Sequence, residues 1–408
     1  MRILWIKANK ILPVHSGGDI RSFNILRHLS SRNEVVFCSY YDGPPDDHYA
    51  EELRQFLPNA VAISTGRRKP GVVSRTVAYC AALHRSEPFA ISRFSSRSVK
   101  DWISKRCCET EPDVIVCDFL NAAINIPRLR VIPAVLFQHN VESELWKRRA
   151  LLESHPFRRF FYRIEYSKMA AYERRTLAAF EHIIAVSEHD KQLMSEWLNP
   201  SRITVVPTGV DLREYTPSTR DPQTRSVVFV GAMDWEPNID AVEFFATKIW
   251  PAVVAEIPTA LFRIVGRNPA PRVAKLKSNS IEVTGRVSST AEYLQNASIV
   301  VVPLRIGGGT RLKIYEAMAC AKAIVSTSVG AEGLAVESGR NIVIADTPDI
   351  FAKAVIRLLQ SPAIREKIAS AAVELARSFD WSVVASKFER SLEQTVKEFG
   401  RSRSNASN

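Results

Sequence analysis

Two cations and a carboxylate stand at helical spacing directly after a run of glycines. In chain order this segment contains Gly307, Gly308, Gly309, Thr310, Arg311, Lys313 and Glu316. Glycine lets the backbone approach a ligand closely, and the free amides at a helix N-terminus attract anions. Arg311 and Lys313 would add full charges there, and Glu316 would lie one turn after Lys313 on the same side of the helix. This chemistry suits a nucleotide sugar, whose diphosphate needs cations and whose ribose hydroxyls need an acceptor.

The elements around these residues predict a βαβ unit. The apolar run Ile299–Pro303 is rich in β-branched residues, as in a strand buried on both faces of a parallel sheet. Thr310 can cap a helix predicted over Arg311–Ala321, and Ala323–Ser326 begins the next strand. Such a unit has an anion site at its mouth. The alternative is a glycine-rich turn with two solvated cations, because an isolated glycine loop is a weak signal.

Residues 298–334 resemble the donor-binding segment of the family four glycosyltransferases. In that family a glycine-rich loop leads into a helix carrying EAMACG-P-V-V-A-T, and here Glu316–Thr327 has the sequence EAMACAKAIVST. Gly330 and the turn at 332–334 follow. The resemblance implies an α/β chain with the GT-B fold, two Rossmann-like doubly wound domains facing a cleft. It also implies transfer of a sugar from a nucleotide diphosphate donor to a hydroxyl acceptor, with retention of configuration, in envelope or capsular polysaccharide biosynthesis.

A second glycine loop follows the first predicted strand, Arg2–Trp5. Gly17 and Gly18 precede a helical pattern and match the loop that, in the resembled family, faces the donor's phosphates and the acceptor. The loop lacks the G-x-G-x-x-G pattern, which argues against dinucleotide binding.

A histidine ends another predicted strand, Ala134–His139. In α/β folds that end of a strand is where ligands bind. A lone histidine is more often structural, but His139 matches the family's histidine that approaches the donor sugar. The resemblance therefore implies a catalytic role for His139, beside Arg311 and Lys313. Glu142 and Glu144 follow directly and could orient an acceptor.

The resemblance extends donor binding to the ends of other predicted strands. Gly231 and Gly266 each follow an apolar strand, and Arg286 and Val287 occupy the segment that passes the donor base in the family.

Two departures from the family concern glycine positions. Gly308 stands where the first of two paired glutamates is usual, Glu316 being the second. Backbone amides of Gly308 and Gly309 are therefore expected to contact the sugar. Lys322 replaces a common glycine, at what the sequence predicts to be a surface turn.

A third departure concerns the diphosphate. After the first strand of the second domain the family usually carries an arginine and a lysine, but residues 231–238 contain neither. Arg311 and Lys313 are predicted to replace them, with Arg305 and Arg286 as the next candidates.

The length of 408 residues favours two domains. The predicted division is an acceptor-side domain, a linker, a nucleotide-sugar domain, a helix crossing back to the first domain and a disordered tail, over 1–206, 207–225, 226–380, 381–400 and 401–408 respectively.

The net charge of +12 is concentrated in two stretches. Residues 65–106 hold ten Lys/Arg against two acidic residues, and residues 146–175 hold nine against three, both interleaved with aromatic residues. Such stretches suit anionic lipid at a membrane surface, and solvated basic helices are the open alternative. No nucleic-acid motif accompanies the charge, so nucleic acid is not an expected partner.

The remaining features predict a cytoplasmic protein, which the two basic stretches could hold at the inner face of a membrane. Lys7 and Lys10 interrupt the N-terminal apolar segment, so no signal peptide is expected. The six cysteines show no C-x-x-C pair and are expected to be reduced. No Asp-x-Asp metal motif is recognised, so neither a metal nor another cofactor is expected.

Two rival functions stay open at this level. One is a nucleotide-sugar epimerase on the same fold, against which the long basic-aromatic segments argue. The other is a non-catalytic scaffold that binds nucleotide or glycan, which the missing first glutamate favours. Donor turnover with and without an acceptor would separate all three.

Overall fold

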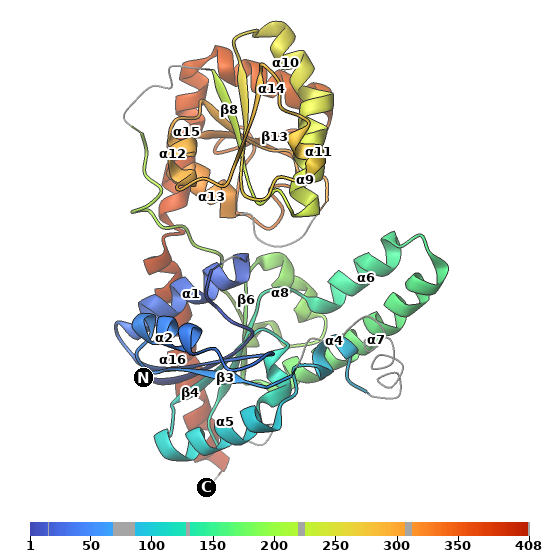
Figure 1. Cartoon of the computed structure of the whole chain (residues 1–408). Helices are drawn as coiled ribbons and strands as arrows, with labels where there is room; N and C mark the ends of the chain where they lie inside the picture. The colour runs from blue at the N-terminus through green and yellow to red at the C-terminus, as the bar shows by residue number, and fades with distance from the viewer. Residues whose placement is uncertain (15, 68–85, 128–130, 219–224, 307–311, 407–408) are drawn as a thin grey trace. The chain divides into compact units, whose positions relative to one another are not determined.

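The computed structural model describes residues 1–14, 16–67, 86–127, 131–218, 225–306 and 312–406. The chain forms two compact units by its internal contacts, Met1–Pro207 with Val384–Asn408, and Thr208–Val383. Each unit is a parallel β-sheet with helices packed on it (Figure 1). The predicted α/β class with two doubly wound sheets is therefore confirmed.

The first unit is built on a seven-stranded sheet in the order β3-β2-β1-β4-β5-β6-β7, with every pairing parallel. Its strands are β1 (Arg2–Ala8), β2 (Glu34–Tyr41), β3 (Ala60–Ser64), β4 (Val114–Asp118), β5 (Ala134–Gln138), β6 (His182–Ala185) and β7 (Ile203–Val205). Every residue of β4 and β5 is buried, as continuous apolar strands at the centre of a parallel sheet require.

Two helices of the first unit begin at serine caps. Ser16 accepts a hydrogen bond from the Asp19 amide at the start of the first helix, and Ser187 does the same for Asp190 in the eighth. The described helices are α1 (Gly17–Ser30), α2 (Asp47–Phe56), α4 (Phe89–Ser92), α5 (Arg97–Thr110), α6 (Glu142–Leu152), α7 (Pro156–Ala179) and α8 (Glu188–Ser195), with short 3-10 turns η1 (Ala122–Asn125) and η2 (Pro200–Arg202).

The second unit repeats the plan with six parallel strands in the order β10-β9-β8-β11-β12-β13. The strands are β8 (Ser226–Val230), β9 (Leu261–Val265), β10 (Ile281–Gly285), β11 (Ile299–Val302), β12 (Ala323–Ser326) and β13 (Val343–Ile344). The helices are α9 (Glu236–Phe244), the π-helical turn η3 (Phe245–Ile249), α10 (Trp250–Glu256), α11 (Pro271–Ala274), α12 (Thr290–Gln295), α13 (Leu312–Ala319), α14 (Pro348–Gln360) and α15 (Pro362–Arg377). In Figure 1, α12, α13 and α15 lie on one side of this sheet, and α9, α10 and α11 on the other.

The strand order creates one topological switch point in each sheet. In both units the first strand is flanked by the second strand on one side and the fourth on the other, so the direction in which successive strands are added across the sheet reverses between β1 and β4 and between β8 and β11. Loops leaving the carboxyl ends of such a strand pair diverge to opposite faces and leave a crevice for ligands. The ends of these four strands are therefore where functional side chains are sought.

The last helix, α16 (Trp381–Ala406), begins in the second unit and completes the core of the first. Phe388 is fully buried, stacks on Trp5 with 5.3 Å between ring centroids, and meets Phe137 edge-on at 5.0 Å. The helix also corrects the predicted tail, because it continues through Ala406 rather than ending at residue 400. Arg403 Nη1 donates to the carbonyl of Val131 at 2.9 Å, which holds the final turns against the first unit.

The predicted surface turn at Lys322 is wrong. Lys322 is only 7% exposed, and its Nζ donates to the Gln295 carbonyl at the end of α12 over 2.7 Å. The turn that ends α13 leads directly into buried strand β12, so the lysine stem is covered. The residue that adopts the left-handed conformation favoured by glycine is its neighbour Ala321, with φ of 55°.

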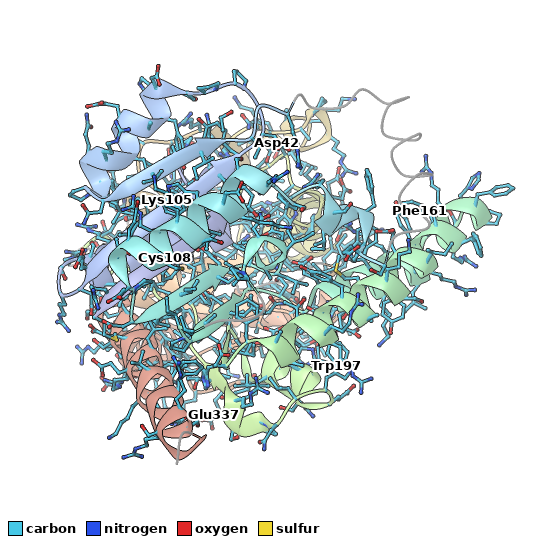
Figure 2. The ribbon with its side chains drawn as sticks, turned by 90° about the horizontal axis from the view of Figure 1, so that it is seen from below. Asp42, Lys105, Cys108, Phe161, Trp197 and Glu337 are labelled. Carbon is cyan, nitrogen blue, oxygen red and sulfur yellow. The ribbon has the colours of Figure 1, made fainter. Side chains whose placement is uncertain are left out.

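The cysteines that the structure describes form no disulfide bond in either unit. Cys38, Cys117 and Cys320 are buried, whereas Cys108 is exposed on the outer side of α5, where it is labelled beside Lys105 in Figure 2. Among the described helices, none combines the length and the apolar character of a membrane span.

Candidate active site

The switch point of the first unit holds a buried ion pair. Lys7, near the end of β1, and Asp118, the last residue of β4, are 1% and 0% exposed. Lys7 Nζ lies 3.5 Å from Asp118 Oδ2, and Trp5 Nε1 donates to the same oxygen at 3.0 Å. Burial alone would raise the pKa of Asp118, but Lys7 and His139 together hold that pKa well below its usual value. The carboxylate is therefore ionised and fully engaged.

The predicted catalytic His139 lies beside this ion pair, directly after β5, and both of its ring nitrogens have partners. Nε2 is 2.8 Å from Asp118 Oδ1, and Nδ1 is 2.6 Å from Arg21 Nη1. A guanidinium can only donate, so Nδ1 accepts and the proton resides on Nε2, which donates to Asp118. Burial lowers the pKa of His139 to about 3, so the ring is neutral at physiological pH.

Phe119 fixes the plane of the His139 ring. The two rings stack with centroids 3.7 Å apart and an interplanar angle of 8°, and Lys7 Nζ lies 4.4 Å from the Phe119 centroid. Phe119 adopts φ of 72°, a conformation rare for a bulky residue and typical of strained positions at functional sites. His139 is 3% exposed, and with both ring nitrogens hydrogen-bonded it is poorly placed to exchange protons.

The first glycine loop packs against the same aromatic ring. Gly17 is the first residue of α1, and a Cβ added to Gly18 would lie 2.4 Å from Phe119 Cζ. Glycine at position 18 is thus required by close approach to Phe119. Asp19, in the first turn of α1, lies 3.3 Å from Lys7 Nζ. The N-terminus of α1 therefore has a carboxylate of its own beside it.

The start of α6 is organised by a buried carboxylate that the sequence did not single out. Glu173 of α7 is fully buried and accepts hydrogen bonds from the amides of Glu142 and Ser143 at 2.8 and 3.0 Å. Burial, with Glu173 nearby, raises the pKa of Glu142 to about 7. Glu144 instead pairs with Lys147 at 2.9 Å. Of the two carboxylates proposed to orient an acceptor, Glu142 is the one held beside the strand ends.

The switch point of the second unit is shaped by two glycines. A Cβ on Gly266 would lie 1.7 Å from the carbonyl oxygen of Gly231, so no other residue fits there. A Cβ on Gly231 would lie 2.6 Å from Asn238 Nδ2 and 2.9 Å from Lys313 Nζ. The absence of side chains at the ends of β8 and β9 therefore leaves the space that the lysine amine occupies.

Lys313 places its charge at the end of β8. Its Nζ donates to Asn238 Oδ1 at 2.9 Å and lies 4.1 Å from the centroid of the Phe229 ring. Asn238 is 3% exposed and also donates from Nδ2 to the Ala232 carbonyl at 2.9 Å. Residues 231–238 lack a cation of their own, but they hold one supplied by α13. Asn238 was not predicted from the sequence. Its position, as a side-chain amide in the first turn of α9, was the available signal.

Glu316 lies on the same helix as Lys313, and its surroundings disfavour its charge. Burial raises the pKa of Glu316 to about 7, with Glu214 contributing, while Lys313 and a hydrogen bond with Tyr215 oppose the rise. The Tyr215 hydroxyl is also 3.2 Å from Thr290 Oγ1. A carboxyl group that is half protonated near neutral pH can exchange its proton when a hydroxyl-bearing ligand arrives. Glu214 and Tyr215 were not anticipated from sequence.

The other predicted site residues lie away from the switch point of the second unit or outside the described residues. Arg286 is exposed and Val287 half-buried after edge strand β10, two strands from β8, or about 10 Å. Arg305, a fallback cation, is already paired with Asp240 and lies 4.4 Å from the Phe244 ring centroid. The predicted contacts Gly307, Gly308, Gly309, Thr310 and Arg311 lie outside the described residues.

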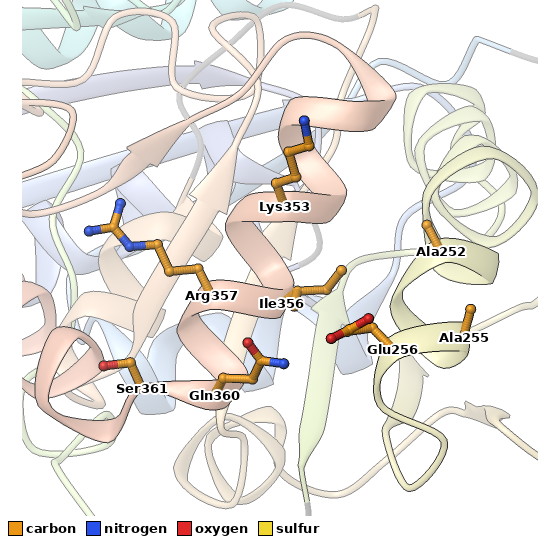
Figure 3. A pocket seen from close by; sticks show the side chains of 8 residues that line it. All are labelled: Ala252, Ala255, Glu256, Lys353, Ile356, Arg357, Gln360 and Ser361. Atoms are coloured by element: carbon orange, nitrogen blue, oxygen red, sulfur yellow. The ribbon is translucent and has the colours of Figure 1, made fainter.

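A separate hollow of about 500 Å³ lies on the helical layer of the second unit (Figure 3). Its lining comes from the carboxyl-terminal ends of α10 and α14, including Glu256, Lys353 and Arg357. Helices that run antiparallel to the strands end at the opposite edge of the sheet from the switch point, so this hollow is not part of the site. Among the described residues no group of three His, Cys, Asp or Glu side chains could hold a metal ion.

Comparison with known proteins gives two family matches. Residues 16–214 match the family described as Glycosyltransferase Family 4, and residues 224–361 match Glycosyl transferases group 1. A Klebsiella pneumoniae protein, described as an uncharacterized 44.6 kDa protein in the cps region, is 26% identical over 60% of this chain and 64% of its own length. The phosphatidyl-myo-inositol mannosyltransferase of Mycobacterium tuberculosis is 28% identical over 52% of this chain and 58% of its own. The chain thus spans about 60% of the length of these curated relatives.

Solved structures share the fold along almost the whole chain. Sucrose-phosphate synthase from Thermosynechococcus elongatus superimposes with a TM-score of 0.66 and 15% identity, covering 96% of this chain and 98% of that one. Anabaena HepE in complex with UDP and glucose gives 0.66 and 14%, covering 97% and 100%. These likenesses confirm the predicted GT-B fold.

Proposed function

We propose that this chain, a GT-B glycosyltransferase of the family 4 type, moves a sugar from a nucleoside diphosphate donor to a hydroxyl of a glycan or lipid-linked glycan. The observation that carries the proposal is the position of Lys313. Its amine occupies the space left by Gly231 at the end of β8, where a diphosphate would meet the switch point of the second unit. We assign nucleotide binding to this unit and acceptor binding to the first.

Residues of the second unit could stabilise the negative charge of the leaving group. As the bond between the anomeric carbon and the phosphate oxygen breaks, its electron pair passes to the diphosphate, which gains negative charge. Lys313 would stabilise that charge at a fixed position, because Asn238 holds its amine in place. Glu316, once deprotonated, would accept hydrogen bonds from the ribose.

The reaction then needs no nucleophile from the protein. The acceptor oxygen would bond to the anomeric carbon on the face that the diphosphate leaves, and its proton would pass to a phosphate oxygen. Configuration would be retained, as the family resemblance implies. The neutral, doubly hydrogen-bonded His139 is compatible with this scheme, because the scheme does not require it to move a proton.

Several finer points belong to the same proposal. The HepE structure holds UDP and glucose, so uridine diphosphate sugars are the first donors to test. The K. pneumoniae relative lies in a cps region, which supports a role in surface polysaccharide assembly. Buried thiols outside any disulfide, at Cys38, Cys117 and Cys320, suit a reducing compartment, and we place the activity in the cytoplasm.

Thermal unfolding with a panel of nucleoside diphosphates and their sugars tests the proposal, because a ligand of the native state raises the melting temperature. At least one nucleoside diphosphate is expected to stabilise the protein, and its sugar is expected to be consumed only when an acceptor extract is added. Consumption without acceptor would indicate an epimerase or hydrolase. Binding without turnover under either condition would indicate a scaffold.

A further inference from the structure

Helices α6 and α7 form a hairpin whose two halves differ in burial. The helices pack side by side and project from the rest of the first unit (Figure 1). The buried residues of α7 all lie in its second part, from Glu165 onward. The inner end of α6 is tied down by the Glu173 carboxylate, which accepts the amides of Glu142 and Ser143. The outer half of the hairpin, residues 146–163, buries little beyond Ala150.

Large apolar side chains are exposed at the outer half. Leu151, Phe157 and Phe160 are 71%, 81% and 67% exposed. Among the described residues these are three of the four large apolar side chains with the greatest exposure, and the only exposed phenylalanines. Phe161, labelled in Figure 2 on the outer part of α7, is half-buried beside Tyr162. An apolar cluster of this kind on a soluble surface marks an interaction site.

The same outer half is strongly cationic. Residues 146–163 contain six Lys or Arg and a single carboxylate, that of Glu153. The cationic side chains are exposed at Lys147, Arg148, Arg149, Arg158, Arg159 and Arg163. Phenylalanines set among arginines on the outer face of a helix are the composition of elements that lie in the interface of an anionic membrane.

We propose that the outer half of the α6–α7 hairpin docks on an anionic lipid bilayer, with Phe157 and Phe160 entering the headgroup region. Charge complementarity selects this occupant. A second copy of the chain would bring the same cationic surface against itself, and like charges facing each other disfavour such an interface. A neutral apolar partner would leave the arginines without counter-charges.

The position of the hairpin gives the docking a purpose, which rests on the proposed function. Helix α6 begins at Glu142, three residues after His139, and its eleven residues span about 16 Å. The docking surface is thus about one short helix away from the strand ends of the first unit. A bilayer held there would bring a lipid-linked acceptor to the side of the unit that carries His139.

Vesicle flotation of the full chain tests this inference. Vesicles of phosphatidylcholine alone are compared with vesicles that also contain phosphatidylglycerol, at low and high salt. Phe157→Ser with Phe160→Ser removes the apolar contacts, and Arg158→Glu with Arg163→Glu reverses two charges while sparing the Arg159 to Glu153 carbonyl bond. Ile350→Ser, at an exposed position near the start of α14, and Arg377→Glu, at the exposed end of α15, are the matched controls.

The wild type is expected to float only with anionic vesicles, and less at high salt. The phenylalanine pair should weaken partitioning about a hundredfold, at about tenfold for each ring withdrawn from lipid. The arginine pair should weaken it at least about 25-fold, at about fivefold for each cation. Both controls should float as the wild type does.

Four outcomes would overturn the inference: no flotation, equal flotation with neutral and anionic vesicles, wild-type flotation of either outer-half variant, or self-association abolished by the phenylalanine pair without vesicle binding. Thermal stabilisation by a nucleoside diphosphate is measured on the same proteins. It depends on the second unit alone, so it should persist in every variant, and its loss would count against the proposed function instead.

Discussion

Replacement of Lys313 by methionine is the sharpest test of how the second unit holds its donor. Methionine keeps a long, unbranched stem beside the Phe229 ring but removes the amine 2.9 Å from Asn238 Oδ1. A hydrogen bond to a charged group contributes about 1.5–3 kcal/mol. Affinity for the nucleoside diphosphate should therefore fall about 10- to 150-fold.

The same change has a structural cost that must be separated from binding. Asn238 is buried and would lose the donor to its side-chain oxygen, which costs about 1–3 kcal/mol when nothing replaces it. Chemical denaturation measures this cost directly. Isothermal titration with uridine diphosphate is then carried out well below the melting temperature, where the variant is folded.

Lys275→Met, at the exposed end of α11, is the matched control for general loss of positive charge. It should bind uridine diphosphate with nearly unchanged affinity. If folded Lys313→Met protein binds the nucleotide within about twofold of the wild type, while the wild type binds measurably, then Lys313 does not hold the diphosphate. The reasoning from the space beside Gly231 would then be wrong.

Three further predictions follow from the described contacts. Burial raises the pKa of Glu316 from 4.5 to about 7, so its contribution to the free energy of unfolding is complete below pH 4.5 and is lost as pH rises through 7. Glu316→Gln should therefore flatten the dependence of the unfolding free energy on pH in this range. In the wild type, nucleotide binding should release a proton, which titration in buffers of different ionisation enthalpy would measure. Asp118→Asn should lower the free energy of unfolding by at most about 3–5 kcal/mol, because it removes the fully buried carboxylate beside the Lys7 ammonium and leaves only the partly exposed Asp19, whereas Asp113→Asn, at an exposed pair, should change it by less than about 1 kcal/mol. Gly18→Ala should cost about 1–3 kcal/mol because its Cβ would lie 2.4 Å from Phe119 Cζ, and Phe119→Leu should relieve part of that cost; additive losses in the double variant would contradict this reading of the contact.

Central strands were predictable because they are apolar on both faces. The apolar run Ile299–Pro303 was predicted to be such a strand and contains β11, Ile299–Val302, and the predicted start of the next strand, Ala323–Ser326, is β12. The edge strand β13, Val343–Ile344, was missed, since two half-buried residues at the end of a sheet leave no periodic pattern. A strand buried on both faces leaves a recognisable run of apolar residues in the sequence, whereas a short edge strand does not.

The candidate site divides along similar lines. Lys313 and Glu316 could be placed on one helix face from their spacing alone. Their partners Asn238 and Glu214 could not, because tertiary structure brings them from segments distant in the chain. The protonation state of His139 was equally beyond reach, since it depends on an arginine 118 residues away.

The discontinuity of the first unit has a consequence for how the chain matures during synthesis. The second unit is continuous in sequence, but the Trp5 and Phe137 rings receive Phe388 only after that whole unit has been made. At about 5–20 residues per second, a ribosome needs roughly 20–80 s to pass from one end of this contact to the other. Throughout that interval the nascent first sheet exposes part of its apolar face, and it depends on chaperones or on partial collapse to stay unaggregated. The first unit, though translated first, is the last to be completed.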